Sequence, residues 1–238
     1  MFAKTRPFLI LFLVFIIVGA WLLATYSKAD LLLAVNGHYS PFGDAVMPWW
    51  TNWGDGGAHI AIIVLLIVYA RRKLGKAAAI RWGWLAFLAF ALPSLLSQVL
   101  KSEFFNKEPR PVTFFASTPD VLHHVPGVEL WTYNSFPSGH TITAFSIALT
   151  LLYLLAPRRV WTWSVLLFVW ACSVGYSRMY LAEHFFKDVY GGAIIGVLAT
   201  LAALWIGERS LPRRWRKRAA GGGVAAGSAA VAGSSAAA

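Results

Sequence analysis

The chain has 238 residues, of which 58% are hydrophobic and only 13% are charged, and its mean hydropathy is +0.60. This profile excludes an ordinary soluble globular protein and predicts an integral membrane protein. The formal net charge is +11, but the basic residues collect at the ends of apolar segments. That placement indicates a membrane topology signal and argues against a nucleic-acid partner.

The first part of the chain predicts one spanning helix and one surface segment. The apolar segment 7–26 is long enough to cross a hydrocarbon core of ~30 Å, and we interpret it as an uncleaved helix. Residues 27–45 are too polar to span and predict a short interfacial helix that ends in a turn at 40–43. A second span is expected over 46–70, where the glycine-rich stretch 54–57 either kinks the helix or marks its start.

The rest of the chain predicts four more spans, at 80–100, 140–156, 160–176 and 185–206, with a long polar loop at 101–136. Residues 1–218 are therefore expected to form one all-α membrane domain, a bundle of six transmembrane helices. Residues 219–238 contain only Ala, Gly, Val and Ser, which predicts a disordered tail or a linker.

Six spans would place both termini on the same side of the membrane. Most Lys and Arg residues adjoin that side, so the positive-inside rule predicts cytoplasmic termini in a bacterial-type inner membrane and an extracytoplasmic loop at 101–136. The basic residues on the other side are Lys28, Lys101, Lys107, Arg110, Arg178 and Lys187.

Two short motifs place ionisable groups beside apolar segments, where such groups are functional candidates. Pro137-Ser138-Gly139-His140 precedes an apolar helix, whose free backbone N–H groups favour an anion. Further on, Ser177-Arg178 is followed by His184 and Asp188. Because the last two are four residues apart, one helix face would let the carboxylate set the imidazole tautomer and leave the other nitrogen free to attack. Together the motifs predict a phosphate site.

These residues resemble two motifs of the type 2 phosphatidic acid phosphatase (PAP2) superfamily. The P-S-G-H motif matches Pro137 to His140. The motif S-R, five residues, H, three residues, D matches from Ser177 to Asp188 with no spacing error.

A third motif of that superfamily, K, six residues, R-P, is matched only in part. Arg110-Pro111 is present, but the position seven before Arg110 is Glu103. We take Lys101 as the equivalent lysine, with a bulge at 104–106 absorbing the extra residues, and Lys107 as the alternative.

The resemblance implies a role for each residue. His184 would be the nucleophile that forms a phosphohistidine, with Asp188 holding its tautomer, and His140 would protonate the leaving group and then activate water. The implied phosphate ligands are Lys101, Arg110, Ser138, Gly139 and Arg178. No metal or other cofactor is expected, because cationic side chains stand where magnesium stands in other phosphatases. A zinc site built from His123 or His124 with His140 and His184 is the less favoured alternative.

The expected function is metal-independent dephosphorylation of a lipid phosphate or pyrophosphate of the phosphatidic acid, phosphatidylglycerophosphate, isoprenyl or lipid A class. The alternatives are a lipid phosphotransferase and a non-enzymatic membrane component or transporter. The expected partners are the bilayer and the lipid substrate, with no nucleic acid and no obligate protein partner. An aromatic rim would admit the headgroup at the bilayer surface, and it comprises Phe104, Phe105, Phe114, Phe115, Trp131 and Tyr133.

Overall fold

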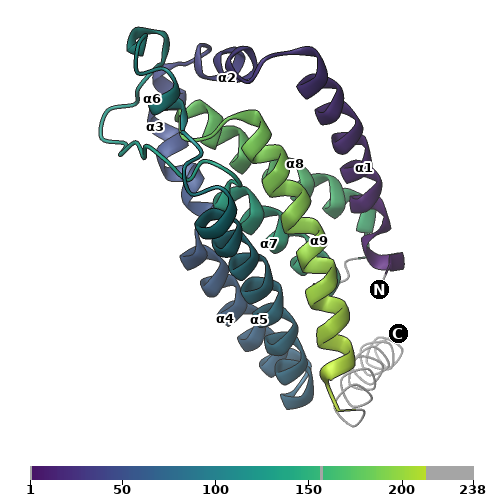
Figure 1. The fold of residues 1–238 in the computed structure, drawn as a ribbon. Coiled ribbons are helices and arrows are strands. Elements are labelled where there is room, and N and C mark those ends of the chain that lie inside the picture. Colours follow the sequence, from purple (N-terminus) through teal and green to yellow (C-terminus); the bar gives the residue numbers. More distant parts are fainter. Residues whose placement is uncertain (1, 156–157, 213–238) are drawn as a thin grey trace.

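The computed structural model describes residues 2–155 and 158–212, and this part of the chain is helical throughout, with no strand (Figure 1). The expected all-α architecture is confirmed. The expected tail at 219–238 lies outside the described residues. The α-helices are α1 (Phe2–Thr25), α2 (Lys28–Asn36), α3 (Pro41–Trp50), α4 (Gly56–Lys73), α5 (Lys76–Val99), α6 (Pro111–Phe114), α7 (Gly139–Leu155), α8 (Val160–Tyr180) and α9 (Phe186–Ser210).

Within the described residues, four helices are long and apolar enough to cross a membrane by themselves, and they include α1, α5, α8 and α9. A fifth candidate is the pair formed by α3 and α4, which bends by 58° at the break between them. Helix α7 is apolar but has only 17 residues, which is short for a spanning helix. The expected count of six spans is therefore not confirmed.

Two local expectations near the N-terminal third need correction. The turn expected at 40–43 is instead a helix start, because the Ser40 Oγ accepts the Gly43 amide at 3.1 Å and Pro41 opens α3. The continuous span expected over 46–70 is divided into α3, a 3₁₀ turn η1 (Thr51–Gly54) and α4. The break falls at the glycine-rich stretch that the sequence singles out.

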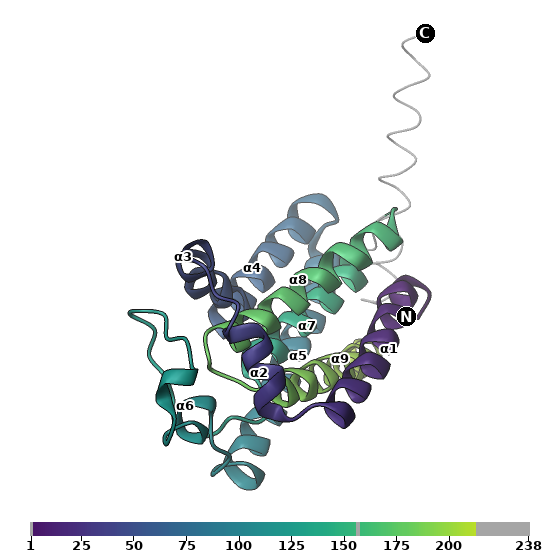
Figure 2. The ribbon, with the colours of Figure 1, turned by 90° about the horizontal axis from the view of Figure 1, so that it is seen from above.

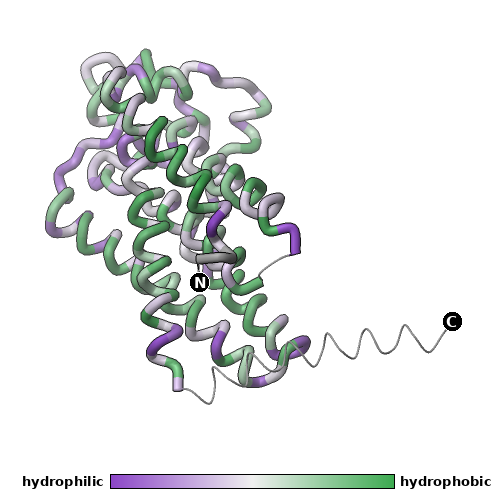
Figure 3. The backbone as a smooth tube through the Cα atoms, turned by 90° about the vertical axis from the view of Figure 1, so that its right-hand side faces the viewer, coloured by the Kyte–Doolittle hydropathy of each residue, from purple (hydrophilic) through white to green (hydrophobic). Residues whose placement is uncertain are grey.

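Helix α7 lies at the centre of the bundle, among α4, α5, α8 and α9 (Figure 2). It is apolar on all faces and most of its side chains are buried, as expected of a helix that other helices surround. Figure 3 shows hydrophobic residues along the long helices and hydrophilic residues at their ends and in the loops.

Small residues let α9 approach α7 closely. A Cβ atom added at Gly192 would lie 2.8 Å from the Ser138 carbonyl oxygen, and one added at Gly196 would lie 2.7 Å from the Ile142 carbonyl oxygen. Such contacts between small residues bring helix backbones together in membrane bundles. Here they hold the start of α7 against α9 and thus set the distance between two of the motif segments.

The ends of α8 and α9 differ from the expected bounds. Helix α8 continues to Tyr180, so Ser177 and Arg178 lie in its last turn rather than beyond its end at 176. Helix α9 begins at Phe186, so His184 belongs to the connection between the two helices.

Candidate active site

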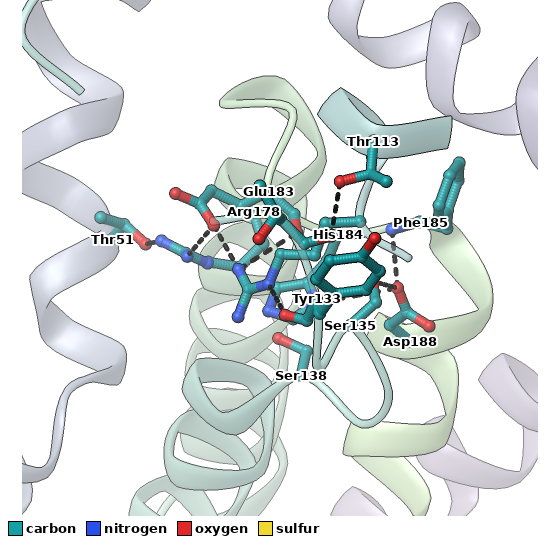
Figure 4. A network of polar contacts seen from close by, with 12 residues as sticks. Thr51, Thr113, Tyr133, Ser135, Ser138, Arg178, Glu183, His184, Phe185 and Asp188 are labelled. Carbon is teal, nitrogen blue, oxygen red and sulfur yellow. Dashed lines mark hydrogen bonds and ion pairs between the residues drawn. The ribbon is translucent and has the colours of Figure 1, made fainter. Parts of the chain in front are cut away.

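Three segments far apart in sequence meet at one end of the bundle, next to α2, α3 and α6 (Figure 1), and Figure 4 shows their polar side chains from close by. They are the loop after α5, the start of α7, and the connection from α8 to α9. The structure brings together the buried side chains of Arg110, Ser138, Arg178, His184 and Asp188. All of them were singled out from the sequence, although their predicted roles rest on the family resemblance.

Arg110 is held by the loop segment that precedes α7. Its backbone amide donates to the Thr132 carbonyl oxygen at 2.9 Å, and its Nε donates to the Tyr133 carbonyl oxygen at 3.0 Å. Pro111 then opens α6, so the chain turns away directly after the arginine. These two hydrogen bonds fix both the backbone and the guanidinium group of Arg110 against the loop segment 132–133.

Arg178 reaches from the last turn of α8 to the break between α3 and α4. Its Nη1 donates to the Thr51 Oγ1 at 2.7 Å, and its Nε is buried with no hydrogen-bond partner among the described residues. The 3₁₀ turn that interrupts the α3–α4 helix thus carries a hydroxyl to the arginine. Sequence reasoning left Thr51 out, because an isolated threonine beside tryptophans carries no chemical signature.

Glu183 is the most important residue that sequence reasoning missed. Its carboxylate is buried between two guanidinium groups: Oε2 accepts from Arg110 Nη1 and lies 3.4 Å from Arg178 Nη2 (Figure 4). Burial raises the pKa of the Glu183 carboxyl, against the opposing charge of both arginines. Burial also lowers the pKa of Arg110, and Glu183 counteracts that shift. The sequence did contain a signal for Glu183, since it is a carboxylate directly before the motif histidine His184.

His184 and Asp188 do not form the expected hydrogen bond. His184 precedes α9, and its Nδ1 lies 3.6 Å from Asp188 Oδ2, beyond hydrogen-bond distance. Asp188 Oδ2 accepts instead from the Ser135 Oγ at 2.5 Å and from the Phe185 amide at 2.9 Å. The expectation of one shared helix face is wrong, because the helix starts two residues after the histidine.

The environment of His184 favours its neutral form. Burial, together with the positive charges of Arg110, Arg178 and Lys101, holds the pKa of His184 well below its ordinary value. A neutral imidazole has a free electron pair on one nitrogen, so the ring is kept ready to attack an electrophile at neutral pH.

The start of α7 supplies fewer free donors than the sequence indicates. The Ser138 amide donates to the Asp188 carbonyl oxygen at 3.0 Å, so it is not free to bind a ligand. The Ser138 hydroxyl oxygen accepts from Thr141 Oγ1 at 2.9 Å, and its own proton can still be donated. Gly139 is the first residue of α7, and a Cβ atom added there would meet nothing within 4 Å. Gly139 and His140 line a cavity of ≈ 260 Å³ together with residues of α4 and α5, and this cavity is separate from the one that Lys101 and Arg110 line.

The structure places Lys101 and Lys107 differently. Lys101 is partly buried and lines a cavity of ≈ 350 Å³ together with Arg110 and Tyr133, whereas Lys107 is exposed. Part of the extra chain length is taken up by a π-helical turn, η2 (Leu100–Phe104), in which the Phe105 amide donates to the Leu100 carbonyl oxygen at 2.9 Å. The wide turn therefore begins before the bulge expected at 104–106.

The expected aromatic rim is present in part. The exposed members are Phe104, Phe114, Trp131 and Tyr133. Phe115 is only 8% exposed and packs in the core with Leu32 and Phe185, so its place in the rim is a wrong prediction. Phe105 is partly buried and contacts Phe136 edge to face at a centroid distance of 4.6 Å.

The histidines considered for zinc are not gathered at one point. His123 Nε2 lies 2.8 Å from Asp44 Oδ1, and its ring stacks on Tyr39, while His124 is exposed. Residues 2–155 and 158–212 hold no group of three or more His, Cys, Asp or Glu side chains that could bind a metal ion. His123 instead ties the loop 101–136 to α3.

Two buried arginines and a buried histidine at one end of a helical membrane fold have the composition of an anion-binding site. The model of the PAP2 superfamily matches residues 82–211, more than half of the chain. The chain belongs to the PAP2 superfamily.

Named relatives are mostly lipid phosphatases. The bacitracin transport permease protein BcrC of Bacillus licheniformis is 37% identical over 120 residues, which cover 50% of this chain and 53% of that protein. The lipid A 4'-phosphatase of Bacteroides thetaiotaomicron is 29% identical over 177 residues, 70% of this chain and 71% of that protein. Phosphatidylglycerophosphatase B of Escherichia coli is 28% identical over 164 residues, 55% of this chain and 63% of that protein. The match thus spans only about half of the first of these relatives.

Two solved structures resemble the fold. LpxE of Aquifex aeolicus has a TM-score of 0.58 and 26% identity, over 77% of this chain and 98% of that one. The first transmembrane PAP2 type phosphatidylglycerolphosphate phosphatase from Bacillus subtilis has a TM-score of 0.61 and 23% identity, over 90% of this chain and all of that one. The second likeness concerns the fold alone.

Proposed function

We propose that this protein is a metal-independent lipid phosphatase that works through a phosphohistidine on His184. The observation that carries the proposal is the meeting of the buried His184 imidazole, whose pKa burial lowers, with the guanidinium groups of Arg110 and Arg178. Buried cations attract a phosphate, and a neutral imidazole beside them is a nucleophile for its phosphorus atom. Membership of the PAP2 superfamily supports the same chemistry.

The reaction has two steps. In the first, an imidazole nitrogen of His184 attacks phosphorus, the bond from phosphorus to the lipid oxygen breaks, and His140 gives its proton to the leaving alkoxide. In the second, His140 removes a proton from water, the water oxygen bonds to phosphorus, and the bond to His184 breaks to release phosphate. Arg110, Arg178 and Lys101 stabilise the charge on the equatorial oxygens in both transition states.

The expected hold of Asp188 on the His184 tautomer takes an indirect form in this proposal. Asp188 accepts from Ser135 and from the Phe185 amide, and these bonds fix the turn that carries His184. A shift of a few tenths of an ångström would bring His184 Nδ1 from 3.6 Å into hydrogen-bond range of Asp188 Oδ2. Catalytic hydrogen bonds are often long in ligand-free sites and tighten when substrate binds.

The substrate class follows from the surroundings of the site. Exposed Trp131 and Tyr133 line the same cavity as Lys101, and exposed Phe104 and Phe114 lie on the chain segments that continue from its lining residues. Aromatic side chains favour the membrane–water interface, where a lipid headgroup enters while its chains stay in the bilayer. Relatives named for lipid A, phosphatidylglycerophosphate and undecaprenyl diphosphate support a lipid phosphate or pyrophosphate.

The experiment is a phosphate-release assay on the purified full chain. We expect release from lipid phosphates in excess chelator, and inhibition by vanadate, whose trigonal bipyramidal form resembles the transition state. Loss of activity in chelator that zinc or magnesium restores would refute the metal-independent mechanism. A parallel assay with an acceptor lipid distinguishes hydrolysis from phosphotransfer.

We further propose that the site faces the outside of the cytoplasmic membrane, with cytoplasmic termini. The support is the distribution of Lys and Arg, since Arg71, Arg72 and Lys73 end α4 at the opposite end of the bundle from the site. A cysteine introduced at the exposed Thr118 should react with an impermeant reagent in intact spheroplasts, and one at the exposed Ser210 should not. The reverse labelling pattern would place the chemistry in the cytoplasm.

A further inference from the structure

Glu183 occupies one of the unspecified positions between the arginine and the histidine of the motif, yet it is only 3% exposed. It accepts from Arg110 and faces Arg178, so that one carboxylate joins the two guanidinium groups nearest to His184. A buried carboxylate beside an anion-binding site weakens that site by charge repulsion, and a role only in packing does not require a carboxylate there.

The hydrogen-bond pattern shows what this carboxylate does to the arginines. Arg110 uses Nε on the Tyr133 carbonyl oxygen and Nη1 on Glu183, both on its carboxylate and on its carbonyl oxygen at 3.3 Å. Arg178 uses Nη1 on Thr51 and turns Nη2 to Glu183. The groups left over are Arg110 Nη2, which bonds no acceptor in the described part of the chain, and the buried Arg178 Nε.

The backbone of Glu183 is anchored independently of its side chain. The amides of Glu183 and His184 both donate to the Arg178 carbonyl oxygen, at 2.9 and 3.2 Å. The turn that presents His184 therefore does not depend on the carboxylate. A change from Glu to Gln keeps the shape of the side chain and one acceptor oxygen, removes the charge, and replaces the other oxygen by an NH₂ donor.

We propose that Glu183 is a positioning residue that aligns the two guanidinium groups on the phosphate and limits the positive charge of the site, so that phosphate is released after each turnover. The inference rests on the proposed function. The site holds three cations, Lys101, Arg110 and Arg178, against the carboxylates of Glu183 and Asp188. Without the Glu183 charge, a phosphate dianion would meet one more unit of net positive charge at short range, where the effective dielectric constant is low.

The test compares E183Q with wild type in detergent-solubilised full-length protein. Binding of inorganic phosphate and of vanadate is measured directly by calorimetry, and kcat and KM are measured by phosphate release from a lipid phosphate. We expect E183Q to bind phosphate about tenfold more tightly, which corresponds to ~1.4 kcal/mol. Because product leaves more slowly, kcat and KM should fall together.

Glu208 provides a matched control. It is also a glutamate that accepts from an arginine, Arg81, but at the opposite end of the bundle. E208Q removes a carboxylate from an arginine contact without touching the site, so it should leave phosphate binding unchanged. A damaged fold would weaken phosphate binding in either variant, which is the opposite sign to the effect expected of E183Q.

E183D separates charge from reach. It keeps the negative charge but shortens the side chain, so phosphate affinity should stay within about threefold of wild type while kcat falls through poorer alignment of the arginines. Unchanged or weaker phosphate binding in E183Q, or equal tightening in E183D, would overturn the inference. Failure of the proposed function looks different, because wild type would then release no phosphate from any lipid phosphate.

Discussion

Two arginine–glutamate contacts stand at opposite ends of this bundle and serve different purposes. At the end away from the site, Arg81 of α5 donates from Nε and Nη2 to Glu208 of α9, and the Tyr153 hydroxyl of α7 donates to the same carboxylate at 2.8 Å. Three helices are joined by one carboxylate with both oxygens in use. The contact therefore has a structural role, which is to hold α5, α7 and α9 together.

At the other end the same pair of residue types is left incomplete. Glu183 pairs with Arg110 and Arg178, but Arg178 Nε, His184 Nδ1 and Asp188 Oδ1 are buried without a partner in the described residues. Each unpaired buried polar group costs about 1–3 kcal/mol. Several unpaired buried donors and acceptors close together indicate a place where a bound ligand would complete their hydrogen bonds. The two contacts therefore differ in how completely the groups around each carboxylate are hydrogen-bonded, and not in residue type.

The largest effect should come from the nucleophile. We expect H184A to lose activity by about 10⁴-fold or more while it still inserts and folds, because no other group at the site can form the phosphoenzyme. Rapid acid-free quenching of wild type with labelled substrate should trap a base-stable, acid-labile phosphoprotein that H184A lacks. Near wild-type phosphate release by purified H184A would end the proposed mechanism.

The lysines sharpen the comparison within the site end. K101A should lower activity on a lipid phosphate by about 10²-fold, the scale for removing one preorganised transition-state donor. K107A is the matched control and should change it less than twofold, because Lys107 is exposed whereas Lys101 lines the cavity with Arg110. The opposite ranking would transfer the role to Lys107.

Acid should destabilise the site end through His184. The pKa of His184 in the folded protein is held below the ordinary value. As the pH falls below about 6.5, His184 therefore becomes protonated in the unfolded chain but stays neutral in the folded protein. This contribution to stability is present above pH 6.5 and is lost progressively as the pH falls from 6.5 towards the folded pKa, so stability should be lower at pH 5.5 than at pH 7.5. Thermal melting of wild type and H184N at both pH values measures it. An equal loss of stability in H184N would contradict the assignment.

The smallest effect on activity is expected at the opposite end. E208Q should change kcat/KM less than twofold and lower stability by about 1 kcal/mol, since it weakens the charge-assisted bonds from Arg81 and Tyr153. Melting temperature and phosphate release on the same sample give both numbers. A large loss of activity in E208Q would mean that the two ends are coupled.

Much of the fold was predictable because hydrophobic runs of membrane length leave few alternatives to helices. The sequence also located the break between α3 and α4, since glycine and aspartate interrupt an apolar run there. Hydropathy could not show that α8 continues to Tyr180 or that α3 begins at Pro41, because both ends are determined by caps and packing at the interface. The count of six spans stays unconfirmed for a related reason: length and composition do not measure how far the 17-residue α7 reaches across a bilayer.

For the candidate site, the sequence by itself determined which ionisable residues stand beside apolar segments: His140, Arg178, His184 and Asp188 were recognisable from that placement and from two short family motifs. Only the tertiary structure decided their partners. Glu183, Ser135 and Thr51 acquire a role through contacts with residues that lie up to 127 positions away along the chain. Spacing along one chain predicts neighbours on a helix, but a buried charge is satisfied by whatever the packing of several helices brings next to it, and that packing is a property of the whole bundle.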